Sequence, residues 1–208
     1  MTTITISRQY GAGGSSVANL IATQLGYEII DKYLINQVAK GLGMTVQEVE
    51  AEAERPRLLL DRLMLSMASL EPALGAGWMP PYPDPFYDAR QEITRLTEEI
   101  IRKVAAAGRA VIVGRGAGFI LQNPSVFRVF LEAPEKICVK TLQKRFGFDE
   151  AQALRQKHRT DANRAAYIKQ LYHADWRDPA HYDLVLNTAR LGYELSAQLI
   201  CQAVSATA

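Results

Sequence analysis

The residues best suited to chemistry gather near the N-terminus, where glycines and serines follow a short β-branched run, Ile4-Thr5-Ile6. Apolar residues at helical spacing come next, beginning at Val17. Glycines let backbone N–H groups point into one concavity, and a helix N-terminus adds partial positive charge, so a strand, a glycine turn and a helix in this order form a phosphate-binding loop. We expect a hydroxyl at the helix start, Ser15 or Ser16, to bind Mg²⁺, and the backbone to bind phosphate over Gly11, Ala12, Gly13, Gly14, Ser15 and Ser16.

This loop departs from the usual phosphate-binding pattern, G-x-x-x-x-G-K-[ST], in which the lysine reaches the β- and γ-phosphates. Gly14 stands at the lysine position, and the nearest fixed cation is Arg8. A guanidinium grips phosphate through two hydrogen bonds, so we expect Arg8 to replace part of the missing ammonium. The alternative is a glycine-rich turn that joins a strand to a helix and binds no ligand.

An acidic candidate, Asp31, follows a short predicted strand at residues 27–30. The carboxyl ends of strands beside a phosphate loop are where α/β proteins bind ligands. Asp31 is therefore predicted to hold a metal-bound water or to accept a proton from a substrate hydroxyl. The alternative is that Asp31 caps a helix over residues 32–41. One residue could serve in both ways.

Arg115 is the next candidate, because it lies between two glycines directly after the apolar run 110–113. Such a run is typical of a strand buried on both faces, so Arg115 is predicted at the same sheet edge as the phosphate loop. The flanking glycines favour close approach of a ligand. The alternative is a surface arginine in a turn.

A second charge cluster lies within a long predicted helix over residues 149–172. Lys157, Asp161 and Arg164 share one helical face, and Arg159 lies off it. We interpret this helix as a lid that brings Arg159 and Arg164 onto the transferring phosphates. The alternative is a solvated helix face, which is the common fate of such charge runs.

Alternating strands and helices must position these residues. Each parallel crossover should be right-handed, which predicts a single three-layer α/β/α domain over residues 1–208 with a five-stranded parallel sheet. The predicted strands lie at residues 4–6, 27–30, 110–113, 126–131 and 182–186. Helices are predicted at residues 15–25, 32–41, 86–107, 149–172 and 191–204, with two more beginning at Thr45 and Pro134.

Residues 45–107 are predicted to form a helical insertion that binds the acceptor. Within it, residues 71–85 carry five prolines, two glycines and Trp78, a composition typical of a loop. This loop could hinge over a substrate or mediate contact between two copies of the chain, as in a homodimer. Both alternatives stay open.

Composition excludes several classes. The chain has 208 residues, 48% hydrophobic and 22% charged residues and a net charge of +2, which is ordinary for a globular protein and too small a charge to indicate nucleic acid or a membrane surface. Cys138 and Cys201 lie far apart at apolar helical positions, so we expect buried free thiols. Without a signal peptide or a membrane-spanning run, the chain is expected to be cytoplasmic.

Taken together, these motifs resemble the cytidylate kinase-like family of P-loop kinases over nearly the whole chain. The resemblance rests on the order of several motifs, each of which would be weak alone. They are residues 6–14, Asp31-Lys32, residues 113–117, Asp161 with Arg164, Asp175-Trp176, Asp178-Pro179 and residues 182–188.

The resemblance implies a P-loop kinase fold and phosphoryl transfer from ATP, with Mg²⁺, to a nucleoside monophosphate. CMP and dCMP are the acceptors that it favours. Arg8, Asp31, Arg115, Arg159, Asp161 and Arg164 would then form the catalytic set. Two departures remove charge from this site: Gly14 replaces the loop lysine, and Gly116 stands where cytidylate kinases carry an acid after the arginine. Three alternatives therefore stay open: a kinase of another small acceptor, a nucleotide-binding regulator without catalysis, and an interaction protein that uses the proline-rich loop.

Overall fold

The computed structural model describes residues 2–31, 40, 43, 45–47 and 85–207. Nearly all of the predicted helix at residues 32–41 and of the loop at 71–85 lies outside these residues. So does most of the 45–107 insertion, including the helix from Thr45 beyond residue 47. The end of the insertion is described and is helical.

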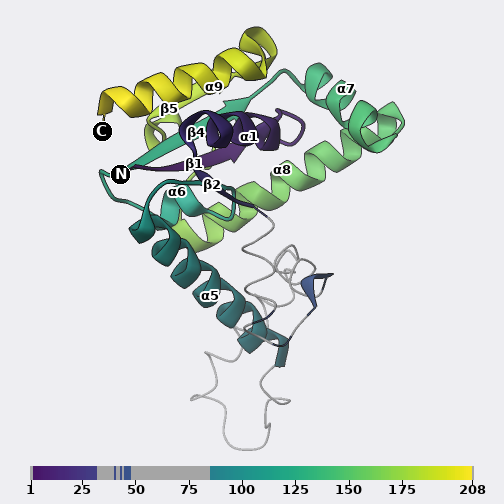
Figure 1. The fold of residues 1–208 in the computed structure, drawn as a ribbon. Coiled ribbons are helices and arrows are strands. Elements are labelled where there is room, and N and C mark those ends of the chain that lie inside the picture. Colours follow the sequence, from purple (N-terminus) through teal and green to yellow (C-terminus); the bar gives the residue numbers. More distant parts are fainter. Residues whose placement is uncertain (1, 32–39, 41–42, 44, 48–84, 208) are drawn as a thin grey trace, which may run out of the picture.

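The described chain alternates strands and helices around one parallel sheet (Figure 1). The strand order is β2-β3-β1-β4-β5, so β1 is central and the chain moves first to one side of it and then to the other. The strands are β1 (Thr3–Arg8), β2 (Glu28–Ile30), β3 (Ala110–Val113), β4 (Val126–Glu132) and β5 (Leu184–Asn187). The predicted five-stranded parallel sheet is confirmed.

Helices cover both faces of the sheet, as expected for a three-layer domain. They are α1 (Gly14–Leu25), α5 (Pro85–Ala107), α6 (Ala117–Ile120), α7 (Glu135–Phe146), α8 (Glu150–Tyr172) and α9 (Thr188–Thr207). A short 3-10 helix, Pro179–His181, precedes β5. The largest differences from the prediction are that α6 was not foreseen, that β5 starts two residues later than residue 182, and that α9 begins at Thr188 with a kink at Gly192.

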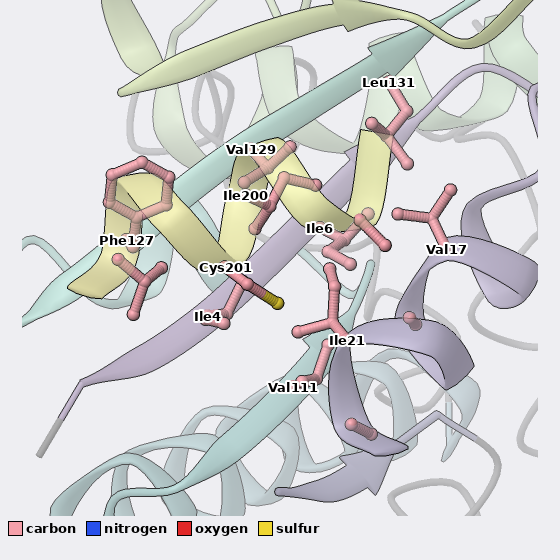
Figure 2. Close-up of a cluster of buried hydrophobic side chains, with 14 of the residues drawn as sticks. Ile4, Ile6, Val17, Ile21, Val111, Phe127, Val129, Leu131, Ile200 and Cys201 are labelled. Carbon is pink, nitrogen blue, oxygen red and sulfur yellow. The ribbon is translucent and has the colours of Figure 1, made fainter. Parts of the chain in front are cut away.

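The main core lies between the sheet and the pair α1 and α9 (Figure 2). Ile4 and Ile6 point from β1 to this side because side chains alternate along a strand. They pack against Ile21 of α1 and Ile200 of α9. All four side chains are buried, which fixes the start of α1 against the end of β1.

The opposite face of the sheet carries two further clusters. Ile30, Ile101 and Ile112 pack where α5 and α6 cover β2 and β3. Phe130 packs with Ile168 of α8 and with Trp176. The second cluster packs α8 against the carboxyl-terminal half of β4. Both cysteines are buried free thiols, as predicted. In the part of the chain that the structure describes, no helix is long and apolar enough to span a membrane.

Candidate active site

The glycine turn between β1 and α1 is held on both sides by neighbouring helices. Gly11 and Gly13 have φ angles of 90° and 79°, a region that glycine enters at no steric cost. A Cβ on Gly11 would lie 2.6 Å from the carbonyl oxygen of Cys138 at the start of α7, and one on Gly13 would overlap the ring of Tyr193 on α9. The turn therefore requires glycine at both positions.

The start of α1 has the features of an anion site. Gly13 is the N-cap and provides no side-chain hydrogen bond to the helix, and the first N–H groups of any helix lack intrahelical acceptors. The buried hydroxyl of Thr188 donates to the carbonyl oxygen of Ala12, 2.9 Å away, and thereby fixes the turn from α9. The N–H groups are thus held in place with their partial positive charge toward the carboxyl edge of the sheet.

Arg8, the last residue of β1, crosses the site along two glycines. A Cβ on Gly14 would lie 2.6 Å from Cγ of Arg8, and a Cβ on Gly114 would overlap its Nη1. The Arg8 side chain therefore runs over the start of α1 toward the end of β3. It fills the space that a side chain at position 14 would need.

Nearby carboxylates only partly offset the positive charge of the Arg8 guanidinium. Its pKa falls to about 9, first because burial disfavours the charged form and then because Arg164 and Arg115 repel it, while Asp31 and Asp161 act in the opposite sense. Three arginines thus share one small region with two carboxylates. A region with this surplus of positive charge is suited to an anion such as a phosphate group.

Arg115 reaches the site from an unusual backbone segment. Gly114, Arg115 and Gly116 all have positive φ, with Arg115 at 55°. Such a conformation is uncommon for a residue with a side chain and clusters at functional sites. A Cβ on Gly116 would lie 3.1 Å from the ring of Tyr172 and 3.2 Å from that of Tyr167, so α8 packs closely over this turn.

Asp31 and Ser15 meet at the same edge of the sheet. Asp31 directly follows β2, and the Ser15 hydroxyl donates to its carboxylate over 3.5 Å. A hydroxyl and a carboxylate are the hard oxygen ligands that Mg²⁺ prefers, and Mg²⁺ commonly takes only one or two protein ligands and keeps several waters. These two residues fit such an ion. Ser16 is exposed, so Ser15 is the better candidate of the two serines.

The charged face of α8 turns toward the loop and is not solvated. Lys157 and Asp161 are 5% and 4% exposed, so the alternative of a solvated face is wrong for these two residues. Asp161 accepts hydrogen bonds from the Tyr10 backbone N–H at 2.8 Å and from Nζ of Lys157 at 3.1 Å. Arg164 donates to the carbonyl oxygen of Arg8 at 2.7 Å.

The structure does not bring Arg159 into this group, because its side chain is exposed on α8. Arg8, Asp31, Arg115, Asp161 and Arg164 do come together: Asp161 and Arg164 bond to the backbone at Tyr10 and Arg8, and Asp31 and Arg115 lie near enough to Arg8 to affect its pKa. Sequence reasoning did not foresee the contacts of Thr188 and Tyr193 with the loop. The i, i+4 spacing of Lys157 and Asp161 was the signal for their pairing.

A family model described as the cytidylate kinase-like family matches residues 3–190. The chain belongs to this family. Cytidylate kinases from Pyrococcus horikoshii and Methanocaldococcus jannaschii are 28% and 22% identical to it over 189 and 205 residues. The alignments cover 90% and 97% of this chain and 80% and 96% of those proteins.

Two solved structures share the fold of this member of the cytidylate kinase-like family. An uncharacterized protein from Eubacterium ventriosum has a TM-score of 0.70 at 22% identity, with 99% of each chain covered. Shikimate kinase from Bacteroides thetaiotaomicron has a TM-score of 0.55 at 15% identity, with 98% of each chain covered. Family and fold together assign the chain to the nucleoside monophosphate kinase-like phosphotransferases, as the sequence predicted.

Proposed function

We propose that the protein transfers the terminal phosphoryl group of ATP to a nucleoside monophosphate, with CMP or dCMP as the first acceptors to test. The observation that supports this most is the position of Arg8. Its side chain lies over Gly14, where P-loop kinases carry a lysine, and so keeps a cation beside the loop. The archaeal relatives are cytidylate kinases by name, which favours a pyrimidine acceptor.

In this proposal the protein contributes position and charge, as phosphoryl transfer requires. The backbone from Gly11 to Ser15 binds the donor phosphates. Arg8, Arg115 and Arg164 neutralise charge that develops on the phosphoryl oxygens. Ser15 and Asp31 would hold Mg²⁺, which when bound neutralises phosphate oxygens, and Asp31 orients the acceptor or a water.

The remaining parts of the proposal concern acceptor binding and closure. We assign acceptor binding to the insertion at residues 45–107. The proposed lid is residues 149–172. Because the middle of α8 is bonded to the phosphate loop, we assign closure to the first part of this lid, next to the turn that joins α7 to α8. A lid that excludes water would protect the transferring phosphoryl group from hydrolysis.

The test is a coupled assay of ADP release with CMP, dCMP, UMP and AMP as acceptors. We expect turnover that depends on Mg²⁺ and is fastest with a cytidine monophosphate. ATP binding in calorimetry without turnover on any acceptor would replace the kinase by a nucleotide-binding regulator. Absence of ATP binding would remove both.

One observation favours a second candidate, a kinase of another small-molecule acceptor. Gly116 stands where the resemblance leads us to expect an acid, and the rings of Tyr167 and Tyr172 leave little room for any side chain there. An acceptor that needs no acid at this position would suit the site better than cytosine. Turnover of a non-nucleotide acceptor, with CMP bound but not phosphorylated, would select this candidate.

A further inference from the structure

A buried ion pair joins the middle of α8 to the phosphate loop. Lys157 and Asp161 lie one helical turn apart, and their side chains are 7% and 5% exposed. Most of α8 is polar; its buried residues are Ala153, Lys157, Asp161 and Ile168. A charged pair in a buried position is unusual enough to need a reason.

Stability alone is a poor reason, because replacing a buried ion pair with apolar residues of similar size is often neutral or stabilising. The contacts of the carboxylate suggest a different one. One oxygen of Asp161 accepts from Nζ of Lys157, and the other accepts from the backbone N–H of Tyr10, 2.8 Å away. Tyr10 lies within the turn that precedes Gly11.

Arg164 adds a second tie from the same helix. Its Nη1 donates to the carbonyl oxygen of Arg8 at 2.7 Å and lies 3.5 Å from the carboxylate of Asp161. Its guanidinium also lies 5.7 Å from the centre of the Tyr10 ring. The backbone at Arg8 and at Tyr10, which together open the loop, is therefore fixed by adjacent turns of α8.

We propose that Asp161 is a positioning residue for donor binding, which acts by holding the Tyr10 N–H and so fixes the loop amides. Lys157 orients the carboxylate through its hydrogen bond at 3.1 Å. The role in donor binding rests on the proposed function. Two other roles compete with it: direct contact with the acceptor, and a structural pair with no effect on ligands.

Two matched double variants separate these roles. Lys157→Met/Asp161→Asn removes both charges and keeps an oxygen that can accept from the Tyr10 N–H. Lys157→Met/Asp161→Leu removes both charges and that acceptor, with a side chain of similar size. Both remove the two charges of the buried pair together, and Arg164 keeps its hydrogen bond to the Arg8 carbonyl, so both are expected to fold. Only the second leaves the Tyr10 N–H without its partner.

Calorimetry with ATP and with CMP gives the first measurement. We expect the Leu variant to bind ATP about tenfold more weakly than the Asn variant, with equal CMP affinity. Equal ATP affinities would overturn the proposal in favour of a structural pair. A difference confined to CMP would overturn it in favour of acceptor contact.

Amide hydrogen exchange gives a second measurement that needs neither turnover nor a variant. In the wild-type protein without ligand, the Tyr10 amide should exchange more slowly than the amides of Gly13 and Gly14. Fast exchange at Tyr10 would overturn the proposal even if the Leu variant failed to fold. If the wild-type protein bound no ATP, the proposed function would fail, whereas exchange at Tyr10 would still decide whether Asp161 holds the loop.

Discussion

Removal of the Arg8 cation is the sharpest test of the candidate site. We expect Arg8→Ala to weaken ATP binding far more than AMP binding, because the guanidinium lies over the start of α1, where a lysine at position 14 would otherwise reach the β- and γ-phosphates. Hydrogen bonds to charged groups contribute about 1.5–3 kcal/mol each. One such bond corresponds to a loss of roughly 10- to 150-fold in ATP affinity.

Stability should respond in the opposite way to affinity. The folded state lowers the pKa of Arg8, so at neutral pH the charged guanidinium destabilises the folded protein relative to the unfolded chain. Arg8→Met keeps the aliphatic part and removes the charge. We therefore expect its Tm without ligand to equal or exceed that of the wild-type protein, while its ATP affinity falls.

A cation supplied from α1 should rescue the Arg8→Ala variant. We expect the site not to accommodate Gly14→Lys alone, because the new Cβ would lie 2.6 Å from Cγ of Arg8. In Arg8→Ala/Gly14→Lys that atom is gone, and we expect about a tenfold recovery of ATP affinity over Arg8→Ala alone. Arg8→Ala/Asn19→Lys is the matched control, since exposed Asn19 adds the same charge farther along α1. Equal losses of ATP and AMP affinity, or equal rescue by both lysines, would refute the reasoning.

Three further predictions follow from the contacts around the loop. Arg164→Ala should lower kcat by about 10²–10³, measured by coupled ADP release, and should also lower the Tm, because Arg164 is part-buried and donates to the Arg8 carbonyl; equal kcat would exclude a catalytic role. Ser15→Ala should raise the Mg²⁺ concentration for half-maximal turnover more than Ser16→Ala does, since only Ser15 meets Asp31, and equal effects would exclude Ser15 as the ligand. Thr188→Val should cost about 1–2 kcal/mol in chemical denaturation, because it removes the buried donor to the Ala12 carbonyl; an unchanged midpoint would contradict this.

The parts of the fold set by local patterns could be predicted from the sequence. The run Ala110–Val113 is apolar throughout and forms a strand buried on both faces, as its composition indicates. The glycine-rich turn also follows local rules. By contrast, the short helix α6 has Gly116 as its N-cap, in the αL conformation. In the sequence, nothing distinguishes this glycine from one in an ordinary turn.

Contacts between distant segments could not be predicted from spacing. Thr188 lies 176 residues from its partner Ala12, and nothing local to either residue indicates that they meet. The sequence correctly predicted that Lys157 and Asp161 share one face of a helix. Their spacing could not reveal that both side chains are buried against the loop, because charged residues at helical spacing lie on solvated surfaces far more often than in cores.

The glycine at position 14 shows how the sequence signal and the structural reason differ. In the sequence it is the absence of a lysine, and that absence puts catalysis in doubt. In the structure the same glycine makes room for Arg8, and Gly114 makes room for the end of the same side chain. The two glycines and the arginine therefore form one unit, in which each residue type depends on the other two. Here the cation belongs to the end of a strand, and not to the start of the helix as a loop lysine does. Its backbone is held in place from α8 by the hydrogen bond from Arg164 to the Arg8 carbonyl.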